Sequence, residues 1–214
     1  MGISYRSSFP RAGDIPNFVF SGSIGYDING IAVTASHEVG HTLGLGHKGK
    51  GKRSYFSGLN GWGPIMGNPL SIELTQWSKG EYADATDTVD ELLTITTKNG
   101  FGYRDDDYAD TLDGAEVLSI TDGVGEITGI VERNTDVDCF VFESDGSALD
   151  FFVGGISWVT NLDVLVKLYS EDYELIWTYD PSDRLDVEFL FTEAAGTSFL
   201  TVEGTGCDTG SPGI

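Results

Sequence analysis

The feature that most constrains this chain is the run His37-Glu38-Val39-Gly40-His41-Thr42-Leu43-Gly44-Leu45-Gly46-His47. An α-helix is predicted for residues 31–43. On that helix His37 and His41 lie one turn apart on the same face, so both imidazoles can bind one metal ion. Glu38 is about 100° further round the helix. Its carboxylate is therefore expected beside the ion rather than on it, where a general base is useful.

The third metal ligand is expected to follow a sharp bend. Gly44 can adopt the left-handed conformation that ends a helix, and the turn brings His47 toward the same ion. Three protein ligands and an open position are typical of catalytic zinc, whereas structural zinc is closed by four ligands and usually uses cysteine. We therefore predict one catalytic Zn²⁺ held by His37, His41 and His47, with Glu38 as general base and acid.

The spacing HExxHxxGxxH, followed by a turn with a methionine at residues 63–68, resembles the metzincin clan of zinc endopeptidases. The resemblance implies that Met66 forms an apolar base beneath the three histidines. Residues 75–82 (TQWSKGEY) also resemble secreted, reprolysin-like bacterial peptidases. Lys48 replaces the aspartate of adamalysin-type members, and Asn68 replaces the tyrosine of astacins and serralysins. The subfamily is therefore not assigned.

Simpler interpretations exist for parts of this pattern. A bare HExxH occurs by chance in unrelated helices, and a lone methionine such as Met66 is often a core filler. The full pattern with a glycine at the bend is far more specific than HExxH alone.

Composition divides the 214 residues into two halves. Residues 1–100 contain 8 Lys and Arg against 9 Asp and Glu, whereas residues 101–214 contain 4 against 25. We predict two domains, residues 1–101 and residues 102–214. The acidic half would repel nucleic acid and anionic membranes, so no partner of either kind is expected. The metzincin resemblance implies a protein or peptide substrate.

The second half has the pattern of an all-β domain. Short runs with near alternation are separated by turn residues, and no helix is expected between them. The predicted strands are 118–120, 137–142, 162–169, 173–178, 187–191 and 199–202. The predicted fold is α+β, as the C-terminal part of a metzincin catalytic domain, followed by an all-β sandwich. The strings DVDCFVFES and GTSFLTVEG resemble the pre-peptidase C-terminal type of accessory domain.

The first half is expected to contain further short elements. Strands are predicted at Gly2 to Phe9 and at Asn17 to Phe20. The first strand is either an ordinary strand or, as the metzincin resemblance implies, a ledge that pairs with substrate. Asp27 or Asn29 is expected to cap the zinc helix. A closing helix is predicted at Thr86 to Thr94, with Asp87 as its N-cap and Val89, Leu92 and Leu93 on its buried side.

Several other residues allow two interpretations each. Asp105, Asp106 and Asp107, together with Asp136 and Asp138, either hold Ca²⁺ or are acidic turns on a solvated surface. Residues 48–53 (KGKGKR) form either a solvated basic loop or a contact for an acidic substrate or for the acidic half. Tyr55, Trp62 and Pro64 either line a specificity pocket or pack beneath a loop. Trp158 and Trp177 are either a sugar platform or core aromatics, and Cys139 and Cys207 are either a disulfide or free thiols.

The start of the chain bears on localisation. It lacks the basic and apolar segments of a signal peptide, and no run is long enough to span a membrane. A metzincin domain needs several strands and a helix ahead of its zinc helix, yet only 36 residues precede His37. We therefore expect a secreted peptidase whose domain begins upstream. The alternative hypothesis is a non-catalytic secretion, folding or binding module that acts through the acidic sandwich, with an incomplete zinc site.

Overall fold

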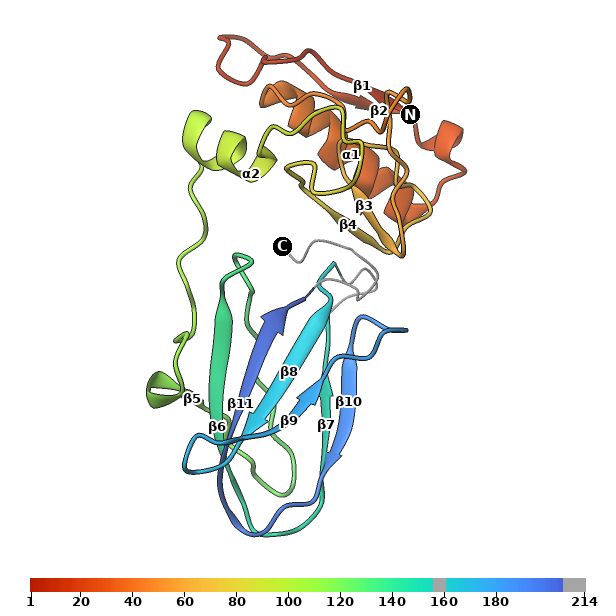
Figure 1. The fold of residues 1–214 in the computed structure, drawn as a ribbon. Coiled ribbons are helices and arrows are strands. Elements are labelled where there is room, and N and C mark those ends of the chain that lie inside the picture. Colours follow the sequence, from red (N-terminus) through yellow and green to blue (C-terminus); the bar gives the residue numbers. More distant parts are fainter. Residues whose placement is uncertain (156–160, 206–214) are drawn as a thin grey trace. The chain divides into compact units, whose positions relative to one another are not determined.

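The computed structural model describes residues 1–155 and 161–205, which form two compact units (Figure 1). The first unit is Met1–Tyr103 and the second begins at Arg104. Each unit is described below by itself. Trp158 and Cys207 lie outside the described residues, so the structure does not test the sugar-platform or the disulfide alternative. None of the helices in the described ranges is long and apolar enough to cross a membrane.

The first unit is organised around helix α1 (Ile28–Thr42), which follows the 3₁₀ helix η1 (Ser21–Ile24). Of the two predicted caps, Asp27 is the N-cap, and its Oδ2 accepts a hydrogen bond of 2.5 Å from the backbone N–H of Gly30. The helix begins three residues before the predicted start at residue 31 and ends at Thr42, with Leu43 as C-cap. Gly44 follows in the left-handed region, with a φ of +97°, as predicted for the bend. The N–H of Leu45 then donates to the carbonyl of Gly40, and the chain turns back.

The cap of this helix provides a test of its contribution to stability. Replacing Asp27 with alanine removes the only side-chain acceptor that the cap supplies, so we expect the free energy of unfolding to fall by about 1 kcal/mol. The exposed Asp14→Ala change serves as the control and is expected to have little effect. Urea unfolding of both variants measures the difference. Equal stability of Asp27→Ala and wild type would contradict the capping role.

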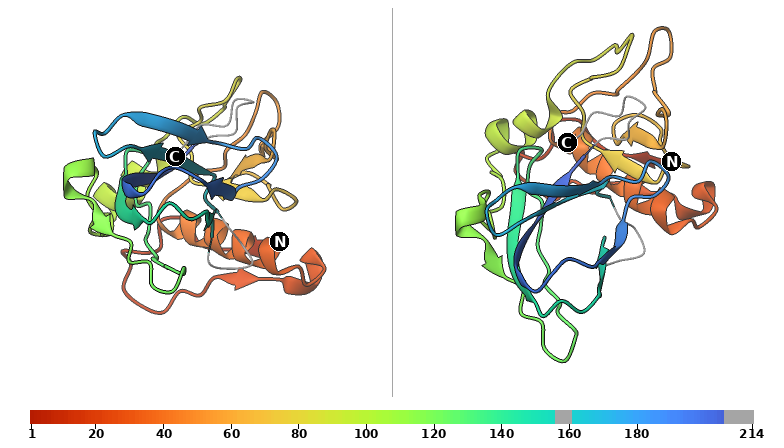
Figure 2. Two further views of the ribbon diagram at one scale, coloured as in Figure 1. Left: turned by 90° about the horizontal axis from the view of Figure 1, so that it is seen from below. Right: turned by 60° about the horizontal axis from the view of Figure 1, so that its bottom comes forward.

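Short strands lie alongside α1 (Figures 1 and 2). β1 (Gly2–Ile3) pairs antiparallel with β2 (Phe18–Val19), and β3 (Trp62–Pro64) pairs parallel with β4 (Leu74–Gln76). The predicted strand at Gly2 to Phe9 is therefore too long. Its later residues bind a helix instead, because the N–H groups of Ser7 and Phe9 donate to the carbonyls of His41 and Thr42 at the end of α1.

The closing helix predicted at Thr86 to Thr94 is also wrong in its bounds. Helix α2 (Glu91–Leu93) starts later and continues into the π-helical turn η2 (Thr94–Lys98). Its N-cap is Asp90, because Asp87 binds Lys48 instead. Val89 and Leu93 are exposed, so the predicted buried face is wrong as well.

The second unit consists of two sheets, a larger mixed sheet and a smaller antiparallel sheet. The larger sheet has the strand order β5-β6-β11-β8-β9, in which β11 pairs antiparallel with both β6 and β8. The smaller sheet pairs β7 antiparallel with β10. The strands are β5 (Glu116–Val117), β6 (Val137–Ser144), β7 (Leu149–Val153), β8 (Val164–Tyr169), β9 (Leu175–Tyr179), β10 (Val187–Phe191) and β11 (Gly196–Gly204), and a 3₁₀ turn η3 (Leu112–Gly114) precedes them.

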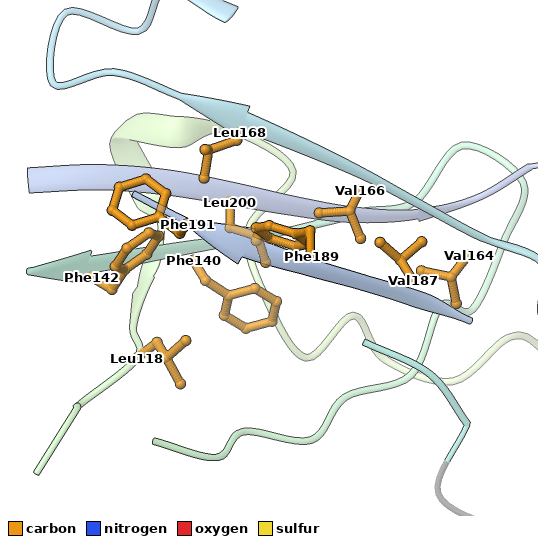
Figure 3. Close-up of a cluster of buried hydrophobic side chains, with 10 residues drawn as sticks. All are labelled: Leu118, Phe140, Phe142, Val164, Val166, Leu168, Val187, Phe189, Phe191 and Leu200. Atoms are coloured by element: carbon orange, nitrogen blue, oxygen red, sulfur yellow. The ribbon is translucent and has the colours of Figure 1, made fainter. Parts of the chain in front are cut away.

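Both sheets contribute side chains to one hydrophobic core (Figure 3). Alternate residues of β8 and of β10 are buried, as a strand with one face on a core requires. The core is Leu118, Phe140, Phe142, Val164, Val166, Leu168, Val187, Phe189, Phe191 and Leu200. Trp177, on β9, is exposed and lies outside this core. The second unit is therefore rich in sheet, and the described chain as a whole has few helices.

The strand predictions differ from the structure mainly at the ends. β10 coincides with the predicted strand 187–191, whereas β6 and β11 are longer than predicted. The predicted strand 118–120 follows β5 rather than forming it, although Leu118 is buried. β7 was not predicted, because its sequence, LDFFV, does not alternate cleanly between apolar and polar residues. None of its residues is fully buried.

Candidate metal and catalytic site

The three predicted ligands come together in the first unit. His37 and His41 lie one turn apart on α1, and His47 reaches them from the chain beyond Gly44. One ring nitrogen from each histidine lies within 4.8 Å of the others, and Nε2 of His47 lies 3.0 Å from Nε2 of His41. Two nitrogens bound tetrahedrally to one zinc ion are about 3.3 Å apart. The set therefore fits a small divalent cation.

Backbone carbonyls fix two of the rings. Nδ1 of His37 lies 2.8 Å from the carbonyl oxygen of Ile65, and Nδ1 of His41 lies 3.0 Å from that of Leu45. A carbonyl only accepts, so each Nδ1 carries the hydrogen and donates it. Nε2 of both residues is left as the lone-pair nitrogen for a metal ion, the arrangement usual for ligating histidines.

The electrostatics favour neutral histidines. Burial is the main cause that lowers the pKa of His37 from its ordinary value. The hydrogen bond to the Ile65 carbonyl opposes it, the charge of His41 lowers the pKa further, and the charge of Glu38 raises it slightly. Burial, and then the neighbouring His41, His37 and Arg6, lowers the pKa of His47 to about 4. A neutral imidazole is the form that binds metal, so these two ligands do not have to lose a proton first.

Met66 lies in the turn where the sequence predicted it and is fully buried, with 0% of its surface exposed. Gly40 explains how the thioether fits against the helix, because a Cβ at this position would lie 2.5 Å from Sδ of Met66. The turn is tied to the ligands on both sides of Met66. Ile65 accepts from His37, and the carbonyl of Met66 accepts from the N–H of Lys48, next to His47.

The predicted base, Glu38, is only 6% exposed. Its Oε2 accepts a hydrogen bond of 2.7 Å from Oγ of Ser4. Gly2 lies so close that a Cβ there would be 2.6 Å from Cγ of Glu38. The pairing of β1 with β2 therefore positions this carboxylate. Ser4 was not predicted as part of the site, and only its place three residues into an expected strand pointed toward it.

The prediction of a solvated basic loop at residues 48–53 is wrong at Lys48, whereas residues 51–53 are exposed. Only 1% of the Lys48 side chain is exposed, and Nζ donates to the carbonyls of Val89 and Asp87 and to Oδ1 of Asp87 at 2.6, 3.2 and 3.3 Å. Glu91 is equally buried, with Oε1 3.9 Å from Nζ. Lys48 and Glu91 thus form a buried charge cluster next to His47, and Asp87, whose side chain is 25% exposed, lies at its edge.

Of the aromatic residues near the site, Tyr55 is exposed beside the histidines and Trp62 is buried. The exposed ring of Tyr55 lies 4.2 Å from that of His47 and 6.4 Å from that of His37, measured between centroids. Trp62 is buried in β3 and donates to Gln76, so it packs in the core, and Pro64 is buried beside it. Asn68 is exposed. Tyr55 thus lies against two of the predicted metal ligands.

No protein-family model matches the chain, and no characterised protein matches it.

Proposed function

We propose that this chain carries the active site of a zinc-dependent endopeptidase. The observation that carries the proposal is the convergence of His37, His41 and His47 around a space that fits one cation, with buried Glu38 on the next position of the same helix. Three histidine ligands leave a coordination position open, as catalytic zinc requires. The metzincin resemblance of the sequence supports the same reaction and a secreted enzyme.

In the proposed mechanism His37, His41 and His47 hold the zinc ion. When bound, zinc supplies a water of lowered pKa and a Lewis acid for the scissile carbonyl. Glu38 accepts the proton of the attacking water and then donates it to the leaving amine. Ser4 orients the carboxylate through its hydrogen bond to Oε2. The Nδ1 donations to Ile65 and Leu45 hold two ligand rings in place.

The first experiment measures zinc by elemental analysis after dialysis against a weak chelator. We expect about one zinc ion per chain in the wild type and little in His41→Ala, because two imidazoles hold zinc far more weakly than three. The control is Val39→Ala, an exposed position on the same helix between two ligands.

Two results would contradict the zinc proposal: a wild type without zinc, or a His41→Ala variant that retains it. Hydrolysis of a generic protein substrate, and its loss in His41→Ala but not in Val39→Ala, tests the reaction class. A zinc-loaded protein without such activity would instead favour the non-catalytic alternative.

A further inference from the structure

A group of carboxylates in the second unit brings together residues that are distant in sequence. Oxygen atoms of Asp106, Asp136 and Asp138 lie within 4.8 Å of one another, and so do those of Asp106, Asp107 and Glu132. The two sets share Asp106, so all five residues form one acidic cluster. It joins the segment that enters the unit to the start of β6.

One member of the cluster has an orphaned atom. Asp138 is only 3% exposed, and its Oδ1 is buried without a hydrogen-bond partner while lying in the group with Asp106 and Asp136. A buried, unpaired carboxylate oxygen is strongly unfavourable unless a cation or a donor satisfies it.

The neighbours of Asp138 make this cost larger. Asp106 and Asp136 place two further carboxylates around this buried side chain. Acidic turns on a solvated surface do not have this property, because water satisfies their oxygens. The backbone still fixes part of the cluster, since Oδ2 of Asp136 accepts from the N–H of Glu132 at 2.7 Å.

We propose that the acidic cluster of Asp106, Asp107, Glu132, Asp136 and Asp138 is a calcium-binding site. All the side chains offer hard oxygen ligands, which Ca²⁺ prefers. Each set brings three carboxylates within reach of one ion. Three carboxylates favour Ca²⁺ over Mg²⁺, because Ca²⁺ takes about 6–8 oxygens in flexible geometry whereas Mg²⁺ uses one or two carboxylates and keeps its waters. The proposal does not rest on the zinc site, which lies in the other unit.

The structure also refines the sequence-based candidates. Asp106, Asp107, Asp136 and Asp138 belong to the cluster, and Glu132 joins them although the sequence did not indicate it. Among the described residues, Asp105 is not in either ligand set. Tyr108 closes one side, since its hydroxyl donates to the carbonyl of Thr128 and its ring packs on Phe140. A bound ion would thus fix residues 106–108 to the sheet.

The test titrates Ca²⁺ into the full, metal-depleted chain by calorimetry and follows thermal unfolding at matched ionic strength. We expect saturable binding of about one ion per chain and a rise of several degrees in Tm at about 10 mM Ca²⁺. Mg²⁺ is expected to give a much smaller rise. An equal rise with Mg²⁺ would overturn the proposal, because it would reflect screening of the acidic surface.

Substitutions of single residues test whether calcium binds at the acidic cluster. Asp138→Asn and Asp106→Asn are expected to weaken calcium binding at least about tenfold, since even outer-shell partners of a metal are worth about 10–100-fold. Asp172→Asn, an exposed acid of the same unit, is the matched control and keeps wild-type binding. Asp106 is exposed, so its variant remains informative if Asp138→Asn does not fold.

Two further results would overturn the site: no binding by the wild type, or unchanged binding in both cluster variants. His41→Ala should retain calcium binding, which separates the fate of this proposal from that of the zinc peptidase.

Discussion

The Glu38→Gln variant is expected to lose peptidase activity by about 10²–10⁴-fold while retaining its zinc. The amide cannot accept the proton of the attacking water. It still offers an oxygen to the hydroxyl of Ser4, whose bond of 2.7 Å holds the present carboxylate. The geometry of the site should therefore survive the change. The measurement is kcat/KM on a protein substrate, with zinc content determined on the same samples.

The control for this variant is Glu73→Gln, which makes the same chemical change at an exposed position of the same unit. We expect wild-type activity from it. An active Glu38→Gln enzyme would disprove the assigned base, and loss of zinc together with activity would show that Glu38 acts on the metal site instead. Ser4→Ala tests the positioning role, with a smaller fall in kcat and a retained KM.

The second large effect concerns the buried charge cluster next to His47. Lys48→Met is expected to lower the free energy of unfolding by about 3–5 kcal/mol, because it leaves the backbone carbonyls of Asp87 and Val89 without their donor and the Asp87 carboxylate without its cation. Lys48 donates to two backbone carbonyls as well as to Asp87, and 1% of its side chain is exposed. Chemical denaturation measures the change.

The matched control is Lys79→Met, which breaks an exposed lysine–glutamate pair at 4.0 Å with Glu81. Exposed pairs contribute about 0–1 kcal/mol. In a double-mutant cycle measured above pH 8, where Glu91 is ionised, adding Glu91→Gln to Lys48→Met should restore part of the loss, because the amide, unlike the carboxylate, needs no cation. Strictly additive effects of the two changes would show that Lys48 and Glu91 are not coupled.

Glu91 also makes the free energy of unfolding depend on pH. Burial is the main cause that raises the pKa of Glu91 to about 8, above the ordinary 4.5, so the folded state holds a proton that the unfolded chain releases. Folding is therefore favoured at low pH, and the contribution of Glu91 to stability declines as the pH rises from about 4.5 to about 8. Glu91→Gln is expected to remove this part of the pH dependence.

The sequence predicted the zinc helix well because its signals are local. The spacing of His37 and His41, the cap at Asp27 and the bend at Gly44 each depend on residues within a few positions. The strands of the second unit were found for the same reason, since alternation in β8 and β10 is visible along the chain. Element ends were predicted less well, as the shortened β1 and the late start of α2 show.

Contacts between distant segments were decided only in three dimensions. Lys48 looked like part of a solvated basic loop, but Asp87 and Glu91 lie about forty positions away in sequence and surround it in the fold. Ser4 binds Glu38 across 34 positions.

What the sequence by itself determined was that His37 and His41 share one face of a helix and that the chain bends at Gly44, because helical periodicity fixes which side chains share a face and glycine allows the left-handed turn. Only the tertiary structure decided which charges are buried and which oxygens are left without partners. Burial depends on chain segments that meet through packing, and no local pattern records it. Glu132 illustrates this, since it joins the acidic cluster only through the fold.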